Sequence, residues 1–348
     1  MAAYHTFITL LVPAVVAYVI TLISTKFLSG YLFESGVFEE DPNKRRLVRL
    51  PSSLGLAVVF GTIVGILAYA FGVSFFVMSA RSILDVRNLF AVSLSLLLIS
   101  LVGFLDDINV KSKLVSATDI KSFKKGLKQW QKPLLTIIGA LPLVAVNAGV
   151  NTIRIPFVGA VNLGLWYPLL VLPLAIIFAA NAVNLLGGFD GLQPGMGAVA
   201  LAGLLVYSVL YGTHTGALIS AIMLAAVLAF LPFNLGKAIP GDSFTYALGT
   251  GLVSIMVLSN AEAFGIILFI PWITEFLLHL RRGFKVSDLG IRQKDGTFKA
   301  PYGKHIYSLT HLVMNMKSVH ETDVAAYLSA VEFAFVVLAF LMKLGGLL

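Results

Sequence analysis

Long apolar runs separated by short polar connections make up almost the whole chain. Each run has about 20 residues, the length of helix that crosses the hydrocarbon core of a bilayer. We count about ten runs, although 196–232 is nearly continuous and is divided only at 212–216. The predicted transmembrane helices are 7–29, 54–77, 88–105, 134–150, 167–186, 196–212, 214–232, 244–260, 263–280 and 324–345.

Composition supports an all-α polytopic membrane protein. Hydrophobic residues make up 58% of the 348 residues and charged residues only 12%, with a mean hydropathy of +0.92. A soluble domain is about one quarter charged, so a soluble protein is excluded. No polar stretch is long enough for a second domain, and we expect residues 1–348 to form a single integral membrane catalytic domain.

The N-terminus and the absence of cysteine bear on whether a signal peptide is present and on which metal ligands are possible. No basic region precedes the first apolar run, which indicates a first transmembrane helix and not a cleaved signal peptide. The chain has no cysteine, which excludes disulfides, thiolate metal sites and a cysteine nucleophile. Any metal must therefore be held by oxygen or imidazole ligands.

The basic residues predict the orientation of the helices. All but four of the 25 Lys and Arg fall on one side of the predicted membrane. Basic residues remain cytoplasmic, so we expect both termini outside and bilayer lipids around the helices. The net charge of +8 reflects this topology first. The predicted cytoplasmic loops are 30–53, 106–132, 184–195, 233–243 and 281–323.

Two connections have turn patterns of their own. Residues 151–164 alternate β-branched and polar side chains around a Pro…Gly turn, which predicts a short external β-hairpin. In the long loop 281–323, the sequence Lys294-Asp295-Gly296-Thr297 predicts a tight turn.

An acidic pair, Asp106-Asp107, ends the third apolar run. Acidic side chains at a membrane boundary are costly unless they are solvated, paired or bound to metal. A solvated helix end is the plain alternative, but the helix dipole disfavours anions at a C-terminus. We therefore expect a functional pair. We favour Asp107 as a base or as the residue that orients the nucleophile, and the sequence leaves open which aspartate, if either, is the base.

Two further polar sets lie at predicted cytoplasmic helix ends. The first combines amide and carboxylate oxygens with turn-forming glycines, and it exceeds what a helix cap requires. The second places Asp242 before a helix, where capping and metal ligation are compatible. Hard oxygen ligands of this kind suit Mg²⁺, or Mn²⁺ in its place. The first set is Asn181, Asn184, Gly187, Gly188, Asp190 and Gly191.

Basic residues on the same side have two interpretations. Lys132, at the start of the fourth predicted helix, is equally compatible with a phosphate ligand and a boundary anchor. Arg281, Arg282 and Lys285 in the last loop favour topology or solvated-surface roles when judged alone.

At these residues the chain resembles the polyprenyl-phosphate N-acetylhexosamine-1-phosphate transferase family, a glycosyltransferase family 4-like group. The resemblance runs from Asp41-Pro42-Asn43-Lys44 to the last helix and includes the aspartate pair, the Asn-x-x-Asn…Asp-Gly-Leu string and the Gly-Asp segment, in order. The eukaryotic and archaeal dolichol branch is more similar, because Gly241-Asp242-Ser243-Phe244 is close to its Gly-Asp-Thr-Phe. The triple-histidine motif of the bacterial last loop is absent, which disfavours a muramyl-pentapeptide substrate.

The resemblance implies a role for each matching residue. Asn184 and Asp242 would hold magnesium with the UDP diphosphate, and Asp106 and Asp107 would lie at the reacting phosphates. Lys132 would contact phosphate. Asp190, with the turn at Gly187-Gly188, would face the uracil. The other nucleotide-sugar-binding residues would be Asn181, Arg281, Arg282 and Lys285. The last three only partly match the arginine/histidine cluster of the eukaryotic last loop, and 51–55 lacks that branch's glutamate and glutamine.

These implications give a functional expectation. We expect transfer of N-acetylglucosamine-1-phosphate from UDP-GlcNAc to polyprenyl (dolichyl) phosphate, releasing UMP, as the first membrane step of lipid-linked glycan assembly. The alternatives are another UDP-N-acetylhexosamine, a cation-coupled transporter, or a lipid-phosphate enzyme that uses no nucleotide. The site would face the cytoplasm from a prokaryotic, by preference archaeal, plasma membrane, or from the endoplasmic reticulum of a eukaryote. A homodimer is compatible with this, and no nucleic-acid partner is expected.

Overall fold

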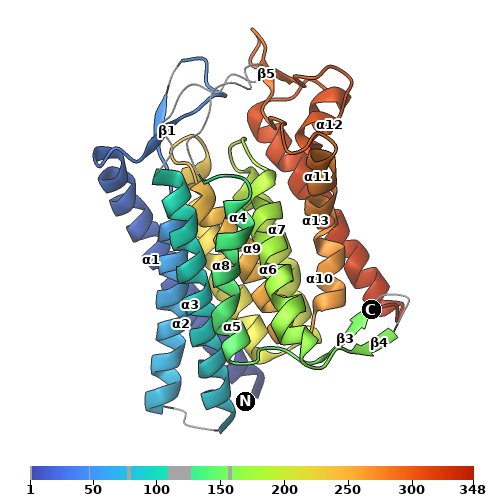
Figure 1. The fold of residues 1–348 in the computed structure, drawn as a ribbon. Helices are drawn as coiled ribbons and strands as arrows, with labels where there is room; N and C mark the ends of the chain where they lie inside the picture. The colour runs from blue at the N-terminus through green and yellow to red at the C-terminus, as the bar shows by residue number, and fades with distance from the viewer. Residues whose placement is uncertain (1, 47, 77–79, 109–126, 156–158) are drawn as a thin grey trace.

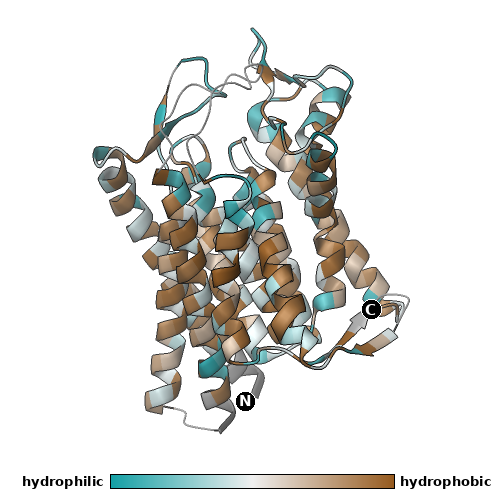
Figure 2. Cartoon of the chain, viewed as in Figure 1, coloured by the Kyte–Doolittle hydropathy of each residue, from teal (hydrophilic) through white to brown (hydrophobic). Residues whose placement is uncertain are grey.

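A computed structural model describes residues 2–46, 48–76, 80–108, 127–155 and 159–348. Its long helices run side by side, with a belt of apolar residues around them and polar residues gathered at one end (Figures 1 and 2). Within the described residues, eight helices are long and apolar enough to cross a membrane, and a bent pair makes a ninth. The predicted polytopic all-α class is confirmed.

Nine helical elements form the eight spans, because one span consists of a π-helical turn, η2, followed by α6. They are α1 (Ala2–Glu34), α2 (Gly55–Phe76), α3 (Ala80–Ile108), η2 (Tyr167–Val171), α6 (Leu172–Leu185), α7 (Leu192–Leu210), α8 (His214–Asn234), α9 (Gly241–Ser259) and α13 (Glu321–Leu344).

The two remaining predicted helices are irregular. In place of one helix over 134–150, the structure has three short consecutive helices: α4 (Gln131–Thr136), η1 (Ile137–Ala140) and α5 (Leu141–Ala145). Together they are shorter than the eight membrane spans. The segment 263–280 breaks into α10 (Glu262–Leu268) and α11 (Ile270–Leu280), which are bent by 55°. Pro271 at the start of α11 favours this break, because proline disrupts a continuing helix.

Three small antiparallel hairpins lie outside the helices. The antiparallel pairing of β3 (Thr152–Ile155) with β4 (Gly159–Asn162) confirms the predicted hairpin in 151–164, although residues 156–158 lie outside the described part of the chain. Its position outside the membrane stays a prediction. The hairpin of β5 (Ile291–Arg292) and β6 (Phe298–Lys299) encloses the predicted turn at 294–297. The hairpin of β1 (Phe38–Glu40) and β2 (Arg49–Pro51) was not predicted, and neither was the short helix α12 (Leu309–Met316).

Helix α9 lies at the centre of the bundle, since 89% of its most apolar window is buried. It packs against α3, α6 and α8, so its N-terminus is surrounded by the ends of other helices. Both chain termini lie at the opposite end (Figure 1). The fold therefore brings distant loop segments together around the start of α9.

Candidate functional site at the start of helix α9

Two aspartates and a lysine from three helices meet at this end of the bundle. Lys132 Nζ lies 2.6 Å from Asp106 Oδ2 and 3.0 Å from Asp242 Oδ2. Asp106 Oδ1 also accepts a hydrogen bond from the backbone N–H of Leu127 at 2.6 Å. A cation between two largely buried carboxylates offsets their mutual repulsion, so these three predicted site residues form one electrostatic unit.

Asp107 has a different environment from its neighbour. Its Oδ1 accepts the backbone N–H of Asp242 at 2.8 Å. Its Oδ2 accepts the hydroxyl of Ser53 at 2.5 Å and the N–H of Ser243 at 3.3 Å. Adjacent positions on a helix point about 100° apart, which allows the two aspartates to have separate partners.

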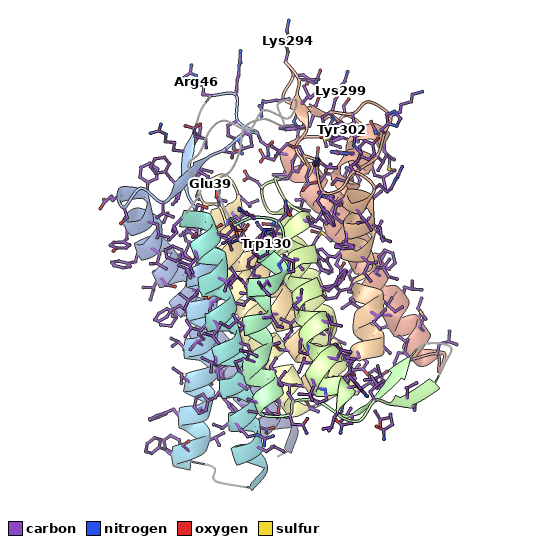
Figure 3. All side chains as sticks on the ribbon, in the orientation of Figure 1. Glu39, Arg46, Trp130, Lys294, Lys299 and Tyr302 are labelled. Atoms are coloured by element: carbon purple, nitrogen blue, oxygen red, sulfur yellow. The ribbon has the colours of Figure 1, made fainter. Side chains whose placement is uncertain are left out.

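A cavity of about 310 Å³ opens beside this cluster. It joins the start of α9 to the end of α6, to the β1–β2 segment, and to the last loop. Figure 3 shows Glu39, one of its lining residues, and Trp130 at this end of the bundle, while Lys294 and Arg46 project further out. The polar lining residues are Glu39, Glu40, Asp41, Asn43, Asn184, Asp190, Gln193, Asn234, Asp242, Asp288 and Glu321.

The two predicted asparagines of α6 have different positions. Asn184 lines the cavity, and its Oδ1 accepts the Thr245 hydroxyl at 3.1 Å. The same hydroxyl also donates to the backbone oxygen of Asp242 at 3.2 Å, so Asn184 and Asp242 share a hydrogen-bonding partner. Asn181 does not line the cavity; its Nδ2 donates to Thr136 Oγ1 and to the backbone oxygen of Ile177.

The loop that follows α6 forms one wall of the cavity. Gly187 and Gly188 line it, and the backbone oxygen of Gly188 accepts a hydrogen bond from Asn43. Asp190 Oδ2 accepts a hydrogen bond from Lys44 Nζ at 2.7 Å. Burial raises the pKa of Asp190, and the contact with Lys44 offsets part of the rise.

Lys44 contacts carboxylates from two distant segments and one from its own segment. Its Nζ lies 2.7 Å from both Asp190 Oδ2 and Glu321 Oε2, and 3.4 Å from Asp41 Oδ2. Burial alone would lower the pKa of Lys44, but the hydrogen bonds to Asp190 and Glu321 outweigh it and raise the pKa. Glu321 was not predicted as a site residue; its only signal in the sequence was a carboxylate at the start of the last helix.

The cavity lining does not include Arg281, Arg282 or Lys285, all of which are exposed. The guanidinium groups of Arg281 and Arg282 lie over the Tyr307 ring, 5.8 and 4.9 Å from its centroid. The same loop reaches the cavity through Asp288 instead. Asp288 accepts a hydrogen bond from His279 at 2.8 Å, and His279 also contacts Glu275 at 2.9 Å.

Two groups of acidic and histidine side chains lie close enough together to hold a cation. Among the described residues, Glu275, His279 and Asp288 form one compact set and Asp41, Asp190 and Glu321 another. Lys44 already neutralises the second set, and His279 bridges the first. Asn184 and Asp242 both line the cavity, and an amide oxygen together with a carboxylate is a hard donor pair that fits Mg²⁺.

The fold is that of an integral membrane protein with a polar site at one end of its helix bundle, and its relatives are membrane transferases. Residues 89–260 match glycosyl transferase family 4. A relative from Saccharolobus solfataricus is 31% identical over 97% of both chains, and one from Sulfolobus acidocaldarius is 31% identical over 95% of both. The chain therefore belongs to glycosyl transferase family 4, as its sequence motifs predicted.

The names of these relatives describe one reaction type. Both archaeal proteins carry the provisional name UDP-N-acetylglucosamine–dolichyl-phosphate N-acetylglucosaminephosphotransferase. A phospho-N-acetylmuramoyl-pentapeptide-transferase of Halalkalibacterium halodurans is 29% identical over 78% of this chain and 80% of its own. The family thus includes relatives named for two different sugar donors.

Proposed function

We propose that this protein transfers N-acetylglucosamine-1-phosphate from UDP-GlcNAc to a polyprenyl (dolichyl) phosphate. The observation that carries the proposal is the Asp106–Lys132–Asp242 cluster beside a polar cavity, at the end of an apolar helix bundle. Such a position gives a lipid phosphate access from the bilayer and a nucleotide access from water. The near full-length likeness to relatives named for this reaction supports it.

The chemistry needs little covalent participation by the protein. An oxygen of the lipid phosphate attacks the β-phosphorus of UDP-GlcNAc, and the bond from that phosphorus to the oxygen bridging the two phosphates breaks. UMP leaves and the sugar–phosphate bond remains intact. Positioning and charge neutralisation dominate phosphoryl transfer of this kind.

The residues of this chain would divide that work. Asn184 and Asp242 would hold magnesium, which supplies charge neutralisation at the diphosphate when bound. Lys132 would contact a phosphate, and Asp106 would face the reacting groups. The wall formed by Gly187, Gly188 and Asp190 would bind the uridine end. Arg281, Arg282 and Lys285 would have to approach the diphosphate by movement of the last loop, and Asn181 would act by holding α6 against α4.

We infer the membrane face of the site from the loops that carry most of the Lys and Arg residues. The site would lie on the cytoplasmic face, in the plasma membrane of a prokaryote. The archaeal relatives support an archaeal membrane.

The direct test compares sugar donors. Purified protein in detergent would be given dolichyl phosphate and magnesium with UDP-GlcNAc, UDP-GalNAc or UDP-MurNAc-pentapeptide, each with an EDTA control. We expect metal-dependent UMP release from UDP-GlcNAc alone. Release only from another donor would retain the reaction and change the sugar, whereas no release from any donor would reject the proposal.

A further inference from the structure

We infer that Ser53 and Asp107 are positioning residues that hold the N-terminus of α9, and through it Asp242, in place for metal binding. This inference rests on the proposed function, because it takes Asn184 and Asp242 as the magnesium ligands. It assigns Ser53 a role and separates Asp107 from proton transfer.

Both carboxylate oxygens of Asp107 are engaged by α9 or by Ser53. Oδ1 accepts the Asp242 N–H, and Oδ2 accepts the Ser243 N–H and the Ser53 hydroxyl. The first N–H groups of a helix have no partner within the helix, and a carboxylate there also complements the helix dipole. Asp107 therefore caps α9 from another helix.

The surrounding backbone is shaped around this carboxylate. Gly241 has φ +73°, and a Cβ at this position would overlap Asp107 Oδ2. A Cβ at Gly103, one turn before Asp107, would overlap the backbone of Asp242 and Ser243. Because no side chain larger than hydrogen fits at either glycine, the end of α3 and the start of α9 are in direct backbone contact.

Ser53 is fixed from the other side. It is fully buried and has φ +63°, a strained backbone conformation for a residue that is not glycine. The next two residues hold the segment before α9, since Leu54 N–H donates to Ile239 O and Gly55 N–H donates to Pro240 O at 2.9 Å. These contacts hold Ser53 in its strained backbone conformation. In that conformation its hydroxyl donates to Asp107 Oδ2.

A general base must reach the proton that it removes. Neither Asp106 nor Asp107 lines the cavity, whereas Asp242 does. The Asp107 carboxylate already accepts three hydrogen bonds from donors that belong to the fold. Asp106 instead contacts the ammonium of Lys132, the group that we propose contacts a substrate phosphate, so Asp106 is the aspartate whose partner would change when substrate binds.

The test measures metal binding without turnover. Electron paramagnetic resonance of Mn²⁺ would give the affinity of the purified, substrate-free protein and of the variants Asp107→Asn and Ser53→Ala. Ser93→Ala is the matched control, because its buried hydroxyl lies on α3 and donates only within that helix, to Leu89 O. UMP release would then be followed as a function of magnesium concentration and pH.

We expect Asp107→Asn to weaken Mn²⁺ binding by roughly 10-fold and Ser53→Ala by about 3-fold, in line with the loss of partners that orient a metal ligand. At saturating magnesium, kcat of both should return to within about 10-fold of wild type. Ser93→Ala should bind Mn²⁺ as the wild type does.

Unchanged Mn²⁺ affinity in Asp107→Asn, with kcat lost at every magnesium concentration, would restore the base role and overturn the inference. If Asp107→Asn does not fold, unchanged Mn²⁺ affinity in Ser53→Ala overturns it equally. Failure of the proposed function is a separate result: the wild-type protein would then bind no Mn²⁺ or release no UMP.

Discussion

Lys132 Nζ contacts Asp106 at 2.6 Å and Asp242 at 3.0 Å, so one ammonium bridges two helices whose ends carry the proposed catalytic and metal-binding carboxylates. A metal held by Asp242 would share this carboxylate with Lys132. We expect the two cations to compete for it, which would make Lys132 available to a phosphate when the metal binds.

This competition predicts opposite effects on binding and turnover in Lys132→Met. Turnover should fall by about 100-fold or more, because a phosphate contact is lost. Affinity for Mn²⁺ should stay equal to that of the wild type or rise. Lys128→Met is the matched control, since this exposed lysine precedes the same helix. Weaker Mn²⁺ binding in Lys132→Met would contradict the competition.

Lys44→Met should affect both stability and nucleotide binding. It would leave Asp41, Asp190 and Glu321 close together without their cation, at a cost of about 1–3 kcal/mol. We also expect the KM for UDP-GlcNAc to rise roughly 10-fold, because the Asp190 wall loses its anchor.

Arg49→Met provides the control for Lys44. Its pair with Glu40 is long, at 3.4 Å, and the arginine side chain is 59% exposed, so its removal should cost no more than about 1 kcal/mol. Thermal unfolding in detergent and UMP kinetics would be measured side by side. Equal behaviour of the two variants would show that the Lys44 cluster is ordinary surface charge.

We expect the last loop to lose stability in mild acid because of the buried His311. Its Nε2 donates to Ser287 O at 2.9 Å, and its Nδ1 accepts the Tyr307 N–H, an arrangement that needs the neutral ring. Burial lowers the pKa of His311 below its usual 6.5. As pH falls through 6.5 the unfolded loop gains a proton that the folded loop resists, so stability decreases with falling pH.

Amide hydrogen exchange across 300–316, corrected for the intrinsic rate, would measure this effect at pH 7.5 and 5.5. Protection should decrease at the lower pH in the wild type and change much less in His311→Gln. The same decrease in both proteins would assign the effect to another group.

The sequence predicted the helices well because hydropathy reports directly on burial in lipid. It singled out Asp106 and Asp242 through their place at helix ends, whereas Lys132 was distinguished from a boundary anchor only by the family resemblance. It could not predict that Lys44 pairs with Glu321, 277 residues away, since pairing depends on which helix ends become neighbours. It also could not separate Asp106 from Asp107, because their different partners, Lys132 and the start of α9, exist only in the folded chain.

The predicted orientation is open to a simple labelling experiment, because the chain has no native cysteine. Lys294→Cys lies in the last loop and Ala160→Cys in the β3–β4 hairpin, and both positions are exposed. In intact cells a membrane-impermeant maleimide should label position 160 and leave 294 unlabelled until the membrane is opened. The reverse pattern would place the site outside.

The transfer of the phosphate together with the sugar is the central claim, and UDP-GlcNAc labelled with ³²P at the β-phosphate tests it most directly. After incubation with dolichyl phosphate and magnesium, the lipid and aqueous phases would be separated and counted. The account predicts that the label moves into the lipid fraction, that unlabelled UMP appears in equal amount, and that EDTA prevents both. Label that stays in water as UDP while sugar enters the lipid would show ordinary glycosyl transfer and contradict the account.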